Sequence, residues 1–175
     1  MKQACGTIAV ALILTAGVAV AQEESTNRVS QETDWTVFVE DNPSQCWAVS
    51  APTETVNTRD GRVVGVDRGD ILLFVSFWPD ENRSGEVSFR GGYTFEPGST
   101  VNVQIGQSRF QLYTEGEVAW AASEAEDAEI ITAMKRGVEA VLTALSNRGT
   151  TTQDTVSLLG FTAAVEDAET RCGAG

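Results

Sequence analysis

The sequence predicts a mainly β domain, an antiparallel sandwich or barrel, with one long and one short helix towards its C-terminal end. About eight short apolar stretches separated by turn residues precede residue 123, and this spacing is typical of antiparallel sandwiches and barrels. The apolar period then changes to steps of three and four residues, and a second stretch with that period ends the chain. The two helices are therefore expected to pack against the sheet.

The first 21 residues have the pattern of a signal peptide. Lys2 provides a positive charge, Ile8–Val20 form a short apolar run, and small residues precede a cleavage site between Ala21 and Gln22. The alternative is a retained membrane anchor, but the run is short for a bilayer span and acidic residues follow it. We therefore expect a periplasmic or secreted protein from a Gram-negative bacterium, without a membrane span after cleavage.

Residues 22–34 are polar apart from Val29, which predicts a flexible leader before a domain over residues 35–175. Within the domain, Ile71–Trp78 is apolar at consecutive positions and predicts a central strand that is buried on both faces. Asp60-Gly61 predicts a two-residue hairpin turn. Alternating strands are also expected at 35–39, 46–50, 63–66, 86–89, 93–95, 101–105, 110–112 and 118–120.

The long helix is predicted to begin at Ser123, whose side chain caps exposed amides while Glu126 returns to the Ser123 amide. One helical stripe then contains Ile130, Ile131, Met134, Val138, Val141, Leu142 and Leu145. Gly137 lies inside this helix and is expected to mark its close packing on the sheet. Residues 150–157 predict a threonine-rich strand at a sheet edge, and residues 161–172 predict the short helix, with Cys172 on its apolar side.

Cleavage of the signal peptide removes Cys5 and leaves Cys46 and Cys172. An even number of cysteines in an exported protein favours a disulfide, although two buried free thiols are the alternative. The inward stripe of the last helix independently favours the Cys46–Cys172 bond. The two residues are 172 − 46 = 126 positions apart, and a loop of that length gives at most about 5 kcal/mol of stabilisation in the chain-entropy model.

The composition excludes several functions. With 12 basic and 25 acidic residues the net charge is −13, which argues against nucleic acid and anionic membranes as partners. The chain has no histidine, so Ser–His–Asp catalysis and imidazole metal sites are excluded. After cleavage Lys135 is the one lysine, and it is expected to be a solvated helix charge. We therefore expect no catalytic residues, no cofactor and no metal site.

Two other features leave alternatives open. Trp35, Trp47, Trp78 and Trp120 could line a sugar-binding face, but most aromatic residues fall at alternating strand positions, which favours core packing. Arg68-Gly69-Asp70 has the tripeptide of many adhesive loops, although a turn before a strand explains it without any function. A hydrolase that uses two carboxylates remains a third possibility, without a recognisable motif.

The order of several stretches resembles the invasion-associated locus B family over about residues 35–173. The stretches that carry the resemblance are Asp34-Trp35-x-Val37, Cys46-Trp47, Arg68-Gly69-Asp70-Ile71-Leu72, Glu86-Val87-Ser88-Phe89-x-Gly91-Gly92-Tyr93, Ala133-Met134-Lys135-Arg136-Gly137, Arg148-Gly149-Thr150 and Leu159-Gly160-Phe161-Thr162-Ala163-Ala164 through Cys172.

This resemblance implies an exported bacterial protein with an immunoglobulin-like antiparallel β-sandwich, on which the two predicted helices would pack, and it carries no catalytic residues. We therefore expect a non-enzymatic envelope protein that acts by binding an envelope or extracellular protein. The alternative is a module that binds a small molecule or glycan through exposed aromatic side chains. The oligomeric state and any role in host-cell invasion stay open.

Overall fold

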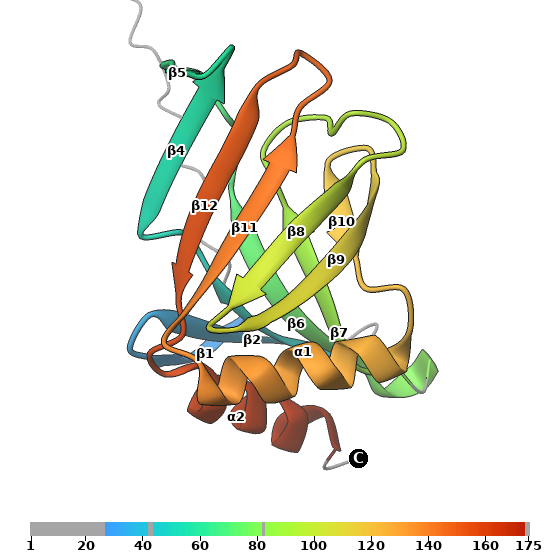
Figure 1. Cartoon of the computed structure of the whole chain (residues 1–175). Helices are drawn as coiled ribbons and strands as arrows, with labels where there is room; N and C mark the ends of the chain where they lie inside the picture. The colour runs from blue at the N-terminus through green and yellow to red at the C-terminus, as the bar shows by residue number, and fades with distance from the viewer. Residues whose placement is uncertain (1–26, 42–43, 82, 174–175) are drawn as a thin grey trace, which may run out of the picture.

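The computed structural model describes residues 27–41, 44–81 and 83–173 (Figure 1). The predicted signal peptide, its cleavage site at Ala21 and Gln22, and residues 22–26 of the expected leader lie outside this range. The strands are β1 Arg28–Glu32, β2 Trp35–Asp41, β3 Ser44–Ser50, β4 Glu54–Arg59, β5 Arg62–Val63, β6 Leu72–Trp78, β7 Arg83–Arg90, β8 Thr100–Ile105, β9 Ser108–Glu115, β10 Val118–Trp120, β11 Glu139–Leu145 and β12 Thr151–Ser157. The α-helices are α1 Glu124–Arg136 and α2 Phe161–Gly173, and a 3₁₀ turn covers Pro79–Glu81.

The described strands form one open, antiparallel sheet in the order β1-β2-β3-β6-β7-β10-β9-β8-β11-β12-β4-β5. The predicted barrel and the β-sandwich implied by the resemblance are both corrected by this order. The reason lies in β10, which pairs with β7 on one side and with β9 on the other and so joins what would otherwise be two sheets. The sheet instead bends, and β8, β9, β11 and β12 lie in front of β6 and β7 (Figure 1).

The inner surface of the bent sheet and the two helices enclose one hydrophobic core. Val75 and Phe89 from β6 and β7 belong to the same buried cluster as Leu112 and Leu142 from the front strands. Both helices lie below the sheet in Figure 1. The ring of Trp35 meets Phe161 of α2 edge-on at 4.8 Å between centroids, which ties α2 to β2.

The prediction of one long helix through residue 145 is wrong. α1 ends at Arg136, and residues 139–145 form β11, so α1 and α2 have the same length of 13 residues. The buried side chains of β11 are Ala140, Leu142 and Ala144. Gly137 does mark close packing, because an added Cβ would lie 2.6 Å from Ile105 Cγ2, but it caps the helix end.

Two further expectations need correction. Arg28–Glu32 of the expected flexible leader form β1, where Ser30 Oγ donates to Asp167 Oδ2 of α2 at 2.7 Å. The leader therefore does not extend through these residues, because pairing with β2 and polar contacts order a strand that lacks an apolar face. The threonine-rich strand β12 is also not at an edge, since β4 pairs with its outer side.

Several local predictions are confirmed. Asp60 and Gly61 both have positive φ (50° and 73°) and connect β4 to β5 as a tight hairpin. Ser123 caps α1 by accepting a hydrogen bond from the Glu126 amide, while Glu126 accepts from the amide of Ala122 and not from that of Ser123. Cys46 and Cys172 form the expected disulfide, with Cα atoms 5.8 Å apart, and it fastens α2 to β3.

Candidate functional site

The outer side of the back half of the sheet carries an unusual number of apolar side chains. We define the aromatic face as the outward-pointing, half-buried residues of β2, β3, β6 and β10, namely Phe38, Trp47, Val49, Leu72, Phe74, Trp78 and Trp120. The strand register makes them neighbours, because Phe38 lies opposite Trp47 and Val49 lies opposite Phe74. Ser88 of β7 lies opposite Phe74 of β6 on one side and opposite Trp120 of β10 on the other, so only this small residue separates the two aromatic residues.

Ring contacts order part of this aromatic face. The rings of Phe38 and Trp47 stack at 5.5 Å with an interplanar angle of 9°. The guanidinium of Arg83 lies over the Trp78 ring at 4.6 Å and is held there by ion pairs with Glu81 and Glu86. These contacts hold aromatic surfaces in place while leaving them partly open to solvent.

The tryptophans therefore divide between the core and the outer surface. Trp35 is fully buried, and its indole N–H donates to the carbonyl of Ser157 at 2.9 Å. Trp47, Trp78 and Trp120 are only half-buried and point outward. Similarly, Leu72 and Phe74 show that β6 is covered on one side only, so the prediction of a strand buried on both faces is wrong for its outer side.

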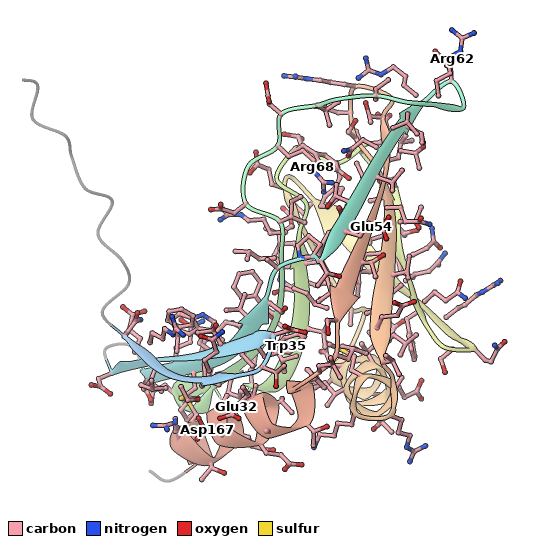
Figure 2. All side chains as sticks on the ribbon, turned by 90° about the vertical axis from the view of Figure 1, so that its left-hand side faces the viewer. Glu32, Trp35, Glu54, Arg62, Arg68 and Asp167 are labelled. Carbon is pink, nitrogen blue, oxygen red and sulfur yellow. A yellow bond between two sulfur atoms is a disulfide. The ribbon has the colours of Figure 1, made fainter. Side chains whose placement is uncertain are left out.

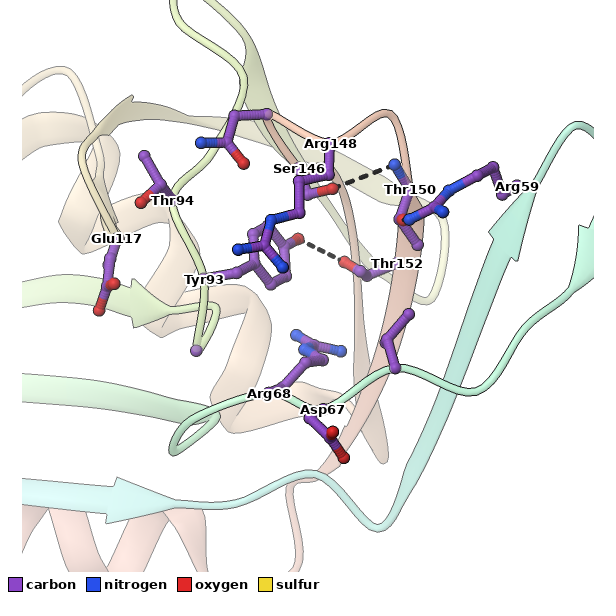
Figure 3. Close-up of a pocket in the computed structure, with 13 residues that line it drawn as sticks. Arg59, Asp67, Arg68, Tyr93, Thr94, Glu117, Ser146, Arg148, Thr150 and Thr152 are labelled. Atoms are coloured by element: carbon purple, nitrogen blue, oxygen red, sulfur yellow. Dashed lines mark hydrogen bonds between the residues drawn. The ribbon is translucent and has the colours of Figure 1, made fainter.

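The second candidate site is a polar pocket of about 420 Å³ at the end of the bent sheet opposite the helices (Figure 3). We call it the arginine pocket. It is lined by Arg59, Val66, Asp67, Arg68, Gly92, Tyr93, Thr94, Glu117, Ser146, Asn147, Arg148, Thr150 and Thr152. These residues come from the end of β4, the loop before β6, the loop after β7, the turn before β10 and the β11–β12 hairpin.

Arg68 forms the fixed wall of the arginine pocket. Its side chain is 5% exposed and makes a two-pronged ion pair with the fully buried Asp154, at 2.7 and 2.8 Å. The remaining N–H groups donate to the carbonyl of Gly91 and the side chain of Asn57. Because all five guanidinium N–H groups have acceptors, Arg68 is held rigidly. It is also unavailable as the exposed arginine of an adhesive tripeptide.

Tyr93 stands beside this ion pair. Its ring lies 4.9 Å from the Arg68 guanidinium carbon, and its hydroxyl shares a 2.6 Å hydrogen bond with Thr152 (Figure 3). Burial raises the pKa of the Tyr93 hydroxyl, so the group is neutral in the pocket at ordinary pH. The sequence interpretation missed this site: Arg68 was assigned to a turn, with an adhesive tripeptide as the alternative, and Arg148 was named only as part of the family resemblance.

Asp67 and Glu117 line the arginine pocket, whereas the buried acidic residue Asp127 lies elsewhere. Asp127 of α1 is 7% exposed and accepts a 2.8 Å hydrogen bond from the Val87 amide. Burial, followed by nearby carboxylates, raises the pKa of Asp127 to about 6. This carboxyl lies in the seam between α1 and β7 and lines neither the arginine pocket nor the aromatic face.

Other site expectations fall on the described residues as follows. Lys135 of α1 pairs with Glu166 of α2 at 3.0 Å, in agreement with a surface helix charge. Within residues 27–173, gaps aside, no three acidic or cysteine side chains group closely enough to hold a metal ion. No helix in that part of the chain is long and apolar enough to cross a membrane.

Comparisons with known proteins bear on the whole domain. The family model described as invasion associated locus B (IalB) protein matches residues 35–169. The crystal structure of invasion associated protein B from Bartonella henselae superposes with a TM-score of 0.53 at 15% sequence identity, covering 83% of this chain and 95% of that chain. At this identity the likeness concerns the fold alone. No curated protein sequence matches.

Proposed function

The chain belongs to the invasion associated locus B family, and from this premise we propose that it is an exported, non-enzymatic envelope protein that acts by binding another protein. The partner is an envelope or extracellular protein with apolar side chains on its contact surface. Periplasmic or secreted location is part of the proposal, and the Cys46–Cys172 bond supports it, because such bonds persist in oxidising compartments.

The observation that carries this proposal is the aromatic face. The side chains of the aromatic face are adjacent and each is partly accessible to solvent, and contiguous apolar patches commonly mark contact surfaces. Aromatic side chains are also enriched among the residues that dominate binding energy in protein interfaces. Trp47 and Phe38 are already stacked on each other, so binding would cost them little further side-chain entropy.

The absence of an enzymatic role is supported by the chemistry of the residues. The chain contains no histidine, and both cysteines of the domain are joined in the disulfide. Asp127, the carboxyl whose pKa is raised to about 6, is buried against the Val87 amide and not in a cleft. Asp127 is therefore not placed to act as the general acid that the hydrolase hypothesis requires.

The proposal is tested by photo-crosslinking in the native cell. A photoreactive phenylalanine derivative in place of Trp47 should give one discrete adduct, which decreases when protein without the label is added in excess. Competitor protein with the substitutions Trp47→Ser and Phe74→Ser should not reduce it. The matched control carries the same label in place of Tyr113, a 55% exposed aromatic residue on the outer side of β9. Equal adducts at both positions would contradict the proposal.

A second candidate function is binding of a small molecule or glycan by the same aromatic face. The stacked rings of Phe38 and Trp47 favour it, because sugars bind against flat aromatic surfaces. This candidate predicts saturable quenching of tryptophan fluorescence by a soluble polysaccharide, and the substitution Trp47→Ser should abolish it. Linear quenching without saturation would leave the protein-binding proposal as the better one.

A further inference from the structure

The arginine pocket concentrates positive side chains in a strongly acidic protein. The chain has 12 basic residues and a net charge of −13, yet Arg59, Arg68 and Arg148 line one pocket. The three come from β4, the loop before β6 and the β11–β12 turn, so the fold and not the local sequence brings them together. Gathering like charges costs free energy unless a counter-charge is present.

Arg68 is paired with a carboxylate of the protein, whereas Arg59 and Arg148 are not paired with a carboxylate among the described residues. The carboxylate of Asp154 neutralises Arg68 from behind. Arg59 donates to the neutral hydroxyl of Thr150 at 2.6 Å, and Arg148 is exposed on the hairpin turn. Neither of them makes an ion pair among the described residues. Asp67 and Glu117 line the same pocket but form no ion pair with Arg59 or Arg148 among the described residues, so both arginines can pair with a group from outside.

The turn that carries Arg148 is held in a defined shape. Gly149 has a φ of 75°, and its amide donates to the carbonyl of Ser146, while the Thr150 amide donates to Ser146 Oγ at 3.0 Å. The Asn147 amide donates to the carbonyl of Thr94, which fixes the turn to the neighbouring loop. Figure 3 shows the Arg148 side chain extending over Tyr93 into the pocket, with Arg68 on its other side.

From this geometry we propose that the arginine pocket binds a small hydroxylated organic acid, whose carboxylate pairs with Arg148 beside Arg59. A guanidinium presents paired N–H donors that match a carboxylate. Ser146, Thr94 and Thr150, which carry hydroxyl groups, line the same pocket. Val66 is the one residue of the lining with a purely aliphatic side chain. A polar lining of this kind suits a ligand with several hydroxyl groups.

Two acidic residues limit the ligand further. Asp67 and Glu117 also line the pocket, and Figure 3 shows Glu117 across Tyr93 from Arg59 and Asp67 next to Arg68. Their carboxylates accept hydrogen bonds from hydroxyl groups and repel a second negative charge. The volume of about 420 Å³ lies near the small end of ligand pockets, which suits a single sugar-sized molecule. The ligand class is therefore a sugar acid with one negative charge.

The proposal is tested by isothermal titration of the intact protein with D-glucuronate, D-glucose and inorganic phosphate. We expect saturable one-site binding of D-glucuronate, binding of D-glucose at least about tenfold weaker because the charged hydrogen bonds are lost, and weak binding of phosphate. Binding of glucose as tight as that of glucuronate would overturn the role of the arginines. Tighter binding of phosphate would overturn the role of the hydroxyls, and no glucuronate binding at millimolar concentration would overturn the proposal as a whole.

Matched variants separate the site from general charge effects. Arg148→Gln should weaken glucuronate binding about tenfold or more, because it removes the fork that meets the carboxylate. Arg62→Gln makes the same charge change at the tip of the β4–β5 hairpin, where the side chain points away from the body of the protein (Figure 2), and should leave binding unchanged. Equal losses in both variants would refute the site. Trp47→Ser should not affect glucuronate binding, so this proposal stands independently of the aromatic face.

Discussion

The two outer sides of the same bent sheet differ sharply in chemistry. The outer side of β8, β9, β11 and β12 carries mainly polar, exposed side chains such as Asn102, Gln111 and Gln153, with Tyr113 and Leu145 as isolated exposed apolar residues. The outer side of the back strands carries the aromatic face instead. Both halves use their inner side for the common core. One half thus has a mainly polar outer surface, whereas the other keeps an apolar outer side that no described segment of the chain covers.

The two halves also differ in what fixes them to their neighbours. The back half is fastened to α2 by the Cys46–Cys172 bond. The front half is tied to the loop before β6 by the buried pair of Arg68 and Asp154.

The largest effect is expected where the buried pair is broken. Asp154→Ala leaves Arg68 charged and buried without its partner, and losses of about 3–5 kcal/mol are typical of such changes. Urea denaturation measures the loss in the free energy of unfolding. Asp67→Ala, which removes an exposed carboxylate nearby, is the control and should change stability by less than about 0.5 kcal/mol. Similar losses in the two variants would show that the pair does not hold the halves together.

Loss of the disulfide should have the next largest effect. Cys46→Ala with Cys172→Ala removes a bond that closes 126 positions of chain, and such bonds contribute about 2–4 kcal/mol. The expected result is a lower denaturation midpoint, with hydrogen exchange increasing first in α2 and β3. If exchange increased first in β11 and β12, the bond would not stabilise the back half more than the front half.

A pH dependence is expected from Asp127, which joins α1 to the back half. Its pKa is raised to about 6 in the folded protein, above its ordinary value of 3.8, so the folded state binds the proton more tightly than the unfolded state. Its contribution to stability is therefore greatest below about pH 4, falls as the pH rises, and is least favourable above about pH 6.

Asp127→Asn should remove this dependence while the side chain still accepts from the Val87 amide. We expect the variant to be more stable than the parent at pH 7 by at most about 3 kcal/mol, with the difference disappearing towards pH 4. Thermal denaturation of both proteins across this range checks it. A difference that is constant with pH would contradict the titration of this group.

Substitutions on the two outer sides of the sheet should have the smallest effect on stability. They also test the difference between these two sides most directly. Trp47→Ser should cost only about 1 kcal/mol because the ring is half-buried, but it should reduce the fluorescence of a bound hydrophobic dye. Tyr113→Ser on the polar side should leave the dye signal unchanged. Equal dye signals in the two variants would remove the distinction between the surfaces.

Much of the strand pattern could be predicted because alternation is a direct consequence of strand geometry. β2, β3, β6, β8 and β9 all coincide with expected strands. β11 could not be recognised, since its buried residues Ala140 and Ala144 are small and favour helices, while Val138, Val141 and Leu145 happen to continue the stripe of α1. Its strand pairing with β8 and β12 overrides this local preference.

Other features depended on contacts between distant segments. β1 lacks an apolar face, and its order comes from pairing with β2 and from the contact of Ser30 with Asp167. The arginine pocket unites loops that are up to 93 positions apart, from Arg59 to Thr152, and no sequence motif describes it. By contrast, the disulfide followed from the cysteine count and the inward side of α2, both of which are visible in the sequence.

The position of the Cys46–Cys172 bond also determines when during synthesis of the chain it can form. A chain is synthesised from its N-terminal side, so Cys46 is made 126 positions before its partner. Any strand pairing that forms before Cys172 is made forms without the covalent link. The bond can therefore stabilise the complete domain but no folding intermediate that lacks the end of α2.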